Sequence, residues 1–188
     1  HKPNESNETK VNLYAGTIYG NVFGGGLGRK AAEGVEAVES FVGGDVQVLL
    51  DGAKIVQTFT GEGENRMPLT GQIFGANNLN GTPKGHVTVH VKRTIDSDKS
   101  SAEALAKTRT QRTTYDVVAV YGGGNQADYI PTNALLDPEA AEGNQALIDA
   151  ATAEVIIEDC DQTSIEYVYG GGNAAAVPAT DVTIKGSY

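Results

Sequence analysis

The chain has 188 residues, of which 24 are glycine and none is tryptophan, and its formal net charge is −10 at pH 7. This length suits one domain with a sizeable core, and the acidic balance excludes a nucleic-acid partner, because phosphate binding needs clustered lysine and arginine. There is no run of about 18 apolar residues, so we expect no membrane-spanning segment, and no secretory signal pattern is visible. The single cysteine, Cys160, excludes an internal disulfide bond.

One phrase occurs four times along the chain and consists of an aliphatic residue, an aromatic residue and two or three small residues. The copies are Val22-Phe23-Gly24-Gly25-Gly26-Leu27, Ile73-Phe74-Gly75-Ala76-Asn77-Asn78, Val120-Tyr121-Gly122-Gly123-Gly124-Asn125 and Val168-Tyr169-Gly170-Gly171-Gly172-Asn173. Such recurrence predicts a repeat architecture. The glycines suit the corners of each repeat, because glycine adopts positive φ and lets adjacent backbones approach.

Four segments alternate β-branched and polar residues, which predicts strands with one buried face. They are Asp45-Val46-Gln47-Val48, His86-Val87-Thr88-Val89, Glu154-Val155-Ile156-Ile157 and Asp181-Val182-Thr183-Ile184. We expect inward side chains at Val46, Val48, Val87, Val89, Val155, Ile157, Val182 and Ile184. We expect outward side chains at Gln47, Thr88, Ile156 and Thr183.

The spacing of these elements favours one all-β fold. The distance is 13 residues from Phe74 to Val87 and from Tyr169 to Val182, and 14 residues from Val155 to Tyr169. A unit of about 27 residues is typical of one coil of a right-handed parallel β-helix, whose strands stack about 4.8 Å apart. A kelch-like β-propeller fragment is the alternative, since its repeats of about 50 residues also carry a glycine doublet.

Stacked coils bring matching positions of the phrase into columns. We expect the rings of Phe23, Phe74, Tyr121 and Tyr169 to form one column. We expect the amides of Asn78, Asn125 and Asn173 to form another, with Leu27 in the corresponding place of an atypical first coil.

The expected organisation is a single β-helix domain over residues 1–188, as part of a longer chain. Its coils are anchored near 16–52, 69–92, 114–160 and 163–186, with insertions near 29–42, 96–113 and 130–152. Helices are expected in the insertions: after the capping box at Ser100, after Asp137-Pro138 over 140–151, and more weakly over 30–40, where Gly34 interrupts.

Three phrases resemble the glycine-rich repeats of large cell-adhesion (adhesin-like) surface proteins of gut bacteria. They are Gly20-Asn21-Val22-Phe23-Gly24-Gly25-Gly26, Val168-Tyr169-Gly170-Gly171-Gly172-Asn173-Ala174 and Asp181-Val182-Thr183-Ile184-Lys185-Gly186. The resemblance covers about half the chain and implies a non-catalytic structural or adhesive module of an exported protein, extracellular or on the cell surface. Its partner would be a host or bacterial surface protein or a glycan.

Metal and phosphate chemistry are not favoured, and we expect no cofactor. Asp128 misses the register of a calcium-binding repeat and the other phrases lack the aspartate, so we expect Asp128, Glu158, Asp159 and Asp161 to belong to a solvated acidic surface. His86 and His90 lie nearly two pleats apart and lack further zinc ligands, so they are expected to be surface histidines. The segment from Gly24 to Lys30 lacks the spacing of a phosphate-binding loop.

Sugar binding remains an alternative function. Tyrosines near the strands suit a carbohydrate-binding module: Tyr14, Tyr19, Tyr115, Tyr129 and Tyr167. A polysaccharide lyase or glycosidase is less favoured, since the outward strand positions offer no acid–base pair and Glu166 is the only charged residue in a phrase strand. No catalytic residue is assigned.

Overall fold

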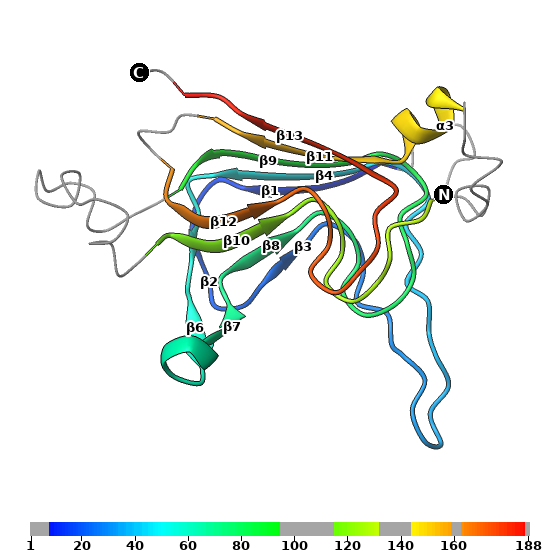
Figure 1. The fold of residues 1–188 in the computed structure, drawn as a ribbon, viewed down its shortest axis with the longest axis horizontal. Helices are drawn as coiled ribbons and strands as arrows, with labels where there is room; N and C mark the ends of the chain where they lie inside the picture. Colours follow the sequence, from blue (N-terminus) through cyan, green and yellow to red (C-terminus); the bar gives the residue numbers. More distant parts are fainter. Residues whose placement is uncertain (1–7, 95–114, 132–143, 159–162, 187–188) are drawn as a thin grey trace, which may run out of the picture.

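The computed structural model describes residues 8–94, 115–131, 144–158 and 163–186, and there the chain is mostly β-strand, with two large parallel sheets (Figure 1). The first sheet has the order β1-β4-β9-β11-β13 and the second sheet has the order β12-β10-β8-β3. The first sheet consists of β1 (Thr9–Leu13), β4 (Val46–Asp51), β9 (Val87–Arg93), β11 (Thr152–Ile157) and β13 (Ala179–Ile184). The second consists of β3 (Val22–Phe23), β8 (Gln72–Phe74), β10 (Val117–Tyr121) and β12 (Ile165–Tyr169).

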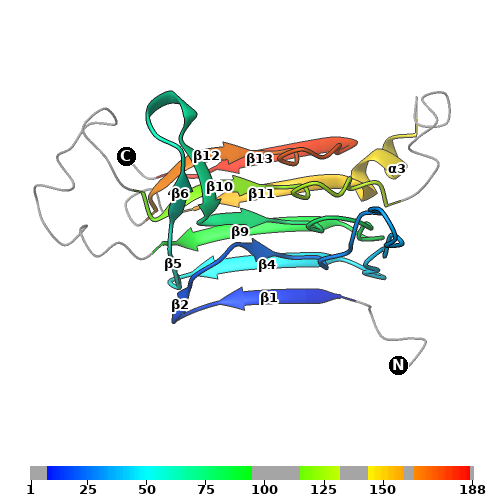
Figure 2. The ribbon, with the colours of Figure 1, turned by 90° about the horizontal axis from the view of Figure 1, so that it is seen from below.

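The chain visits the two sheets in turn, and each strand pairs in parallel with the strands before and after it in the same sheet. In the first sheet Val46 lies beside Val87, and Val89 beside Val155. Figure 2 shows these strands one above another from β1 to β13. Equivalent positions of successive repeats are therefore neighbours in space, and a pair of strands with its connections is called a rung below.

The core lies between the two sheets. The first sheet contributes Val48, Val89 and Val155, which are completely buried, and the second contributes Ile73 and Val120, which are also completely buried. Val46, Val87 and Ile157 are buried too, while Gln47, Thr88 and Ile156 are partly exposed, as the two-residue period predicts.

Val182 and Ile184 lie beside the inward Val155 and Ile157 in parallel register, as expected, but the burial that this implied was wrong, because they are 41% and 60% exposed. Both lie on β13, the last strand of the first sheet. The second sheet ends at β12 in the described chain, so no described strand packs over these side chains. Strand alternation predicts a side chain's direction, but burial also requires a partner across the core.

The expected helix over 30–40 was also wrong. The segment forms a hairpin, here called the finger (Arg29–Val38), with bridges between Arg29 and Val38 and between Ala32 and Val35. Gly34 has φ of 71°, a left-handed conformation that reverses the chain instead of continuing a helix. The finger projects below the body in Figure 1.

A second hairpin was not predicted. It consists of β6 (Thr58–Thr60) and β7 (Met67–Thr70), which pair antiparallel around the 3-10 turn η1 (Gly63–Asn65). Phe59 of this hairpin packs against a cluster on the second sheet that consists of Phe74, Val118, Ala119 and Tyr121. It therefore covers part of the face of that sheet that points away from the core. A short parallel pair, β2 (Thr17–Ile18) and β5 (Lys54–Ile55), lies nearby in the chain.

One of the expected helices is described in part. Helix α3 (Gln145–Ala150) begins at Asn144, whose side chain accepts a hydrogen bond from the Leu147 amide. The start of the predicted 140–151 helix, and all of the helix predicted after Ser100, lie outside the described residues.

Candidate functional site

The aromatic residues of the four phrases form one file of rings. Centroid distances are 4.9 Å from Phe23 to Phe74, 4.8 Å from Phe74 to Tyr121 and 4.9 Å from Tyr121 to Tyr169, with interplanar angles of 5°, 5° and 13°. The file lies on the face of the second sheet that points away from the core, because the preceding aliphatic residues occupy the core face. Phe74 is completely buried, whereas Tyr169 at the end of the file is 43% exposed.

The asparagines of three phrases form a hydrogen-bonded ladder. The Asn173 side chain donates from Nδ2 to Oδ1 of Asn125 at 2.9 Å, and Asn125 donates to Asn78 at the same distance. Leu27 occupies the corresponding place in the first phrase and is 62% exposed. Each amide thus bonds its equivalent in the next repeat, which ties the register of one rung to the next.

Asn77, which interrupts the small residues of the second phrase, anchors the finger. Its side chain is completely buried and accepts a hydrogen bond from the Gly26 amide at 3.0 Å. It also donates to the carbonyls of Ser40 at 2.9 Å and Asn80 at 3.2 Å. Because the donor and acceptor groups of this buried amide all have partners, its burial costs little free energy, and its hydrogen bonds have a structural role.

The first glycine phrase does not form an anion cradle, because the amides of its glycines are used within the stack. Gly24 donates to the Phe74 carbonyl at 2.9 Å and Gly25 to the Ala76 carbonyl at 3.2 Å. No glycine of the four phrases has positive φ, so that part of the expectation was wrong. The glycines are needed because the backbones of adjacent rungs approach closely: a Cβ built at Gly24, Gly75 or Gly122 would lie 2.2 Å from a carbonyl oxygen of the next rung.

The two candidate zinc histidines do not share a site. His86 lies 3.8 Å from Glu154, and Nε2 of His90 lies 3.0 Å from a carboxylate oxygen of Glu158. That second contact is short enough for an ion pair but is not aligned as a hydrogen bond. His90 is the main cause of the lowered pKa of Glu158. The His90 side chain is only 18% exposed, which corrects the expectation of a simple surface histidine.

The acidic residues considered for calcium are not brought together where they are described. Asp128 accepts a hydrogen bond from the Ala176 amide at 2.6 Å, and Glu158 lies beside His90 instead. Asp159 and Asp161 lie outside the described residues. Over residues 8–94, 115–131, 144–158 and 163–186 there is no group of three His, Cys, Asp or Glu side chains placed to hold a metal.

The tyrosines considered for sugar stacking have different environments. Tyr129 is completely buried, donates to the Gly85 carbonyl at 2.7 Å, and has a pKa well above its ordinary value because burial disfavours the phenolate. Tyr14 and Tyr19 are 59% and 77% exposed. Tyr167 is also exposed, and its ring lies 6.1 Å from that of Tyr169. Tyr115 is half-buried.

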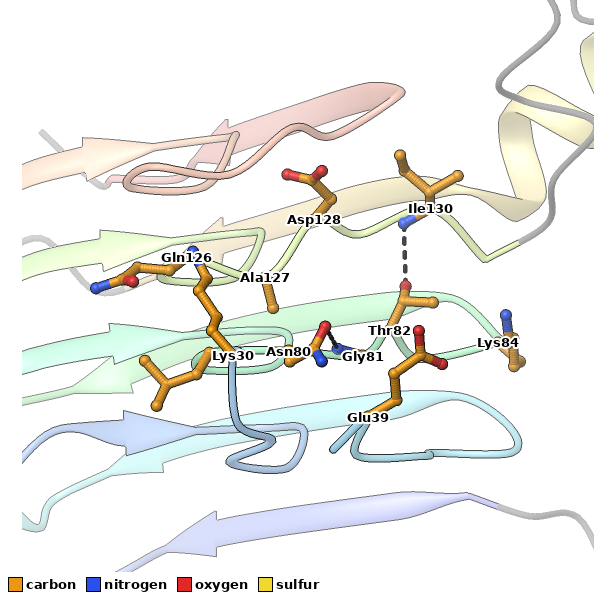
Figure 3. Close-up of a pocket in the computed structure, with 11 residues that line it drawn as sticks. Lys30, Glu39, Asn80, Gly81, Thr82, Lys84, Gln126, Ala127, Asp128 and Ile130 are labelled. Carbon is orange, nitrogen blue, oxygen red and sulfur yellow. Dashed lines mark hydrogen bonds between the residues drawn. The ribbon is translucent and has the colours of Figure 1, made fainter. Parts of the chain in front are cut away.

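A polar pocket of about 440 Å³ lies between the base of the finger and the loops that follow β8 and β10 (Figure 3). Its floor joins two rungs, since the Thr82 hydroxyl accepts a hydrogen bond from the Ile130 amide at 3.0 Å. The charged residues of the lining are Lys30, Glu39, Lys84 and Asp128. Sequence reasoning missed this pocket because these residues come from three separate loops without a shared local motif.

No family model, curated protein or solved structure matches the chain. In the described part of the chain, no helix has both the length and the apolar character needed to cross a membrane. The features that bear on function are therefore the stacked strands, the surfaces they carry and the pocket.

Proposed function

We propose that the chain is a segment of a right-handed parallel β-helix of about four coils that serves as a non-catalytic structural and adhesive module of an exported bacterial surface protein. The observation that carries the proposal is the file of four rings, spaced 4.8–4.9 Å apart in step with parallel strands. This spacing equals that of neighbouring strands in a sheet, so the repeats are stacked along one direction.

Such a stack suits a mechanical role. Each inner strand has hydrogen-bonded neighbours on both sides, and ring stacking and amide bonds join the same repeats elsewhere. Contacts between adjacent repeats give a quasi-one-dimensional scaffold, in which insertions are tolerated at the corners. The finger and the β6–β7 hairpin are such insertions, and they would present the variable contact surface to a partner.

The kelch-like propeller has less support. Propeller blades are radially arranged around a central channel, which would place repeated phrases around an axis. The parallel registers of the two sheets and the single file of rings favour a linear stack instead.

Export and adhesion are tested on the native cell and on the purified module. Antibodies raised against the module should label intact producing cells, and protease added to those cells should remove the label. Beads coated with the module should adhere to host or bacterial cells more than beads coated with module unfolded by heat. Exclusive recovery from the cytosol, or equal adhesion by both bead types, would contradict the proposal.

A carbohydrate-binding module is the second candidate. It is favoured by the exposed pair Tyr167 and Tyr169, which are 44% and 43% exposed and lie in ring contact. Amphipathic rings at a surface are suited to contacts with sugar faces. If this pair binds sugar, Tyr167→Ser will abolish signals that the native module gives on a glycan array, while Tyr19→Ser will leave them unchanged.

A further inference from the structure

The second sheet is one strand shorter than the first. The first sheet has five strands and the second has four, and β12 is the last strand of the second sheet in the described chain. We propose that the outer edge of β12 and of the phrase that follows it is a docking site for one extended strand of a partner protein, and that this strand carries the same repeated phrase. The inference rests on the proposed stack and supplies a partner class for its adhesive role.

The backbone amides of the first three phrases show which bonds the last phrase lacks. In these phrases the glycine after the aromatic residue donates to the carbonyl of the aromatic residue in the next rung, and the following small residue also donates to the next rung. The pairs are Gly24 to Phe74, Gly75 to Tyr121, Gly122 to Tyr169, Gly25 to Ala76, Ala76 to Gly123 and Gly123 to Gly171, at 2.9–3.2 Å. Gly170 and Gly171 hold these positions in the last phrase, and their amides form no hydrogen bond within the described residues.

Two carbonyls of the last phrase complete this edge. The Asn173 amide donates to the Gly124 carbonyl of the preceding rung at 3.0 Å. The Ala174 amide donates to the Asn125 carbonyl at 2.7 Å. The equivalent carbonyls of the last phrase are those of Gly172 and Asn173, and neither accepts a hydrogen bond from any described residue. The edge therefore presents two donors and two acceptors in the order that the inner rungs use, which suits the addition of a parallel strand.

The two side-chain columns end at the same edge. Tyr121 has a ring stacked on each face and is 7% exposed, whereas Tyr169 has a ring of the file on one face only and is 43% exposed. Oδ1 of Asn125 accepts from the Asn173 amide at 2.9 Å, but Oδ1 of Asn173 accepts, within the described chain, only a 3.4 Å bond from the Tyr121 hydroxyl. A partner strand with an aromatic residue and an asparagine four places later extends both columns.

The apolar side of the docking site lies on β13. Val182 and Ile184 continue the columns of Val155 and Ile157, which are buried, but are themselves exposed. In an inner phrase the aliphatic residue before the aromatic one, such as Val120, is completely buried in the core between the sheets. The aliphatic residue of a docked strand would cover Val182 and Ile184, and removal of this apolar surface from water favours binding.

The direction of the phrase amides makes the proposal specific. The amide of the first glycine, such as Gly122, donates to the following rung, whereas the amide of the asparagine, such as Asn125, donates to the preceding rung. A strand docked on β12 occupies the following place, so its asparagine amide bonds to the module and its first-glycine amide does not. N-methylation at the asparagine therefore removes a contact, and N-methylation at the first glycine is the matched control.

The test titrates a fluorescent peptide with the whole module and follows binding by anisotropy. The peptide has the sequence of residues 117–126 and a lysine tag for solubility, and a peptide of reversed order has the same composition without the phrase. Two analogues carry a backbone N-methyl group, one at the Asn125 position and one at the Gly122 position. On the module, Tyr169→Ser removes the last ring of the file. Tyr19→Ser is its control, at an exposed tyrosine that follows β2 at the other end of the stack (Figure 2).

We expect the peptide of native order to bind. N-methylation at Asn125 and Tyr169→Ser should each weaken binding about tenfold, whereas N-methylation at Gly122 and Tyr19→Ser should leave the affinity unchanged. Hydrogen exchange at the Gly170 and Gly171 amides, measured by NMR, should slow about tenfold or more in the complex. The proposal is overturned if the peptide does not bind, if the reversed peptide binds equally, if the two analogues bind alike, or if exchange at these amides is unchanged.

Failure of this docking site is distinguishable from failure of the stack. If the peptide does not bind but Gly75→Ala lowers the melting temperature and Gly171→Ala does not, the stack is supported and the docking site is wrong. If those two variants melt alike, the stack itself is wrong, and the docking site is rejected with it.

Discussion

Gly75, the first glycine of the second phrase, is a site where one added methyl group should disrupt the stack. A Cβ at this position would lie 2.2 Å from the carbonyl oxygen of Gly122 in the next rung and 2.6 Å from a methyl group of Val87. Its φ is not in the left-handed region, so the penalty of Gly75→Ala is a steric one. The same 2.2 Å approach at Gly24 and Gly122 makes it a property of the repeat.

The size of the effect follows from these distances. Real Cβ atoms essentially never lie closer than 3.0 Å to such a neighbour, so the two rungs must separate locally by about 0.8 Å. That shift weakens the hydrogen bond from the Gly75 amide to the Tyr121 carbonyl, now 2.9 Å long. Overpacking costs about 1–3 kcal/mol and one lost hydrogen bond about 1 kcal/mol, so we expect about 3 kcal/mol of destabilisation.

The assay is thermal unfolding followed by circular dichroism, together with urea unfolding. For a chain of this length, 3 kcal/mol corresponds to a melting temperature roughly 6–12 °C lower. Gly171→Ala is the control, because a Cβ there meets nothing within 4 Å and its φ is not positive. That variant should match or slightly exceed the native stability. Equal melting temperatures for the two variants would refute the close approach of the rungs.

Three further variants test other parts of the structure. Asn125→Ala removes both ladder bonds and should cost about 1–2 kcal/mol in urea unfolding, whereas Asn12→Ala, at an exposed position, should change stability little. Burial raises the pKa of Tyr129, so the stability that its neutral hydroxyl contributes is present below pH 10.0, the ordinary pKa of tyrosine, and is lost as the pH rises further. Tyr129→Phe should make this alkaline loss of stability smaller. It should not abolish the loss, because the pKa of Tyr121 is also raised. An unchanged alkaline slope would contradict this assignment. Asn77→Ala strips three hydrogen bonds from the finger base and should speed tryptic cleavage in the finger; unchanged cleavage would show that the anchor lies elsewhere.

The repeated phrase carried enough information to align the rungs. The intervals between the aromatic residues are unequal, but the phrase itself marks equivalent positions, and this was sufficient to predict which rings and which amides are neighbours. The two-residue period likewise predicted the direction of side chains such as Val89 and Thr88, because successive side chains of a strand point to opposite faces.

Insertions were less predictable, because their conformation depends on what they contact. The 30–40 segment contains residues compatible with a helix, yet Gly34 and the anchor from Asn77 make it a hairpin. The β6–β7 hairpin has only a weak sequence signal, which is the alternation of residues on either side of Gly61 and Gly63. Many loops show the same pattern, so it does not identify a short two-stranded element.

The amino-acid sequence by itself determined the all-β class, the strand faces and the order in which repeats lie, because these follow from local periodicity and from identical phrases. Only the tertiary structure decided that Val182 and Ile184 are exposed, that the phrase glycines serve close approach, and that Lys30, Lys84 and Asp128 line one pocket. The physical reason is that burial, steric contact and convergence each depend on two chain segments at once. A local pattern describes only one of them.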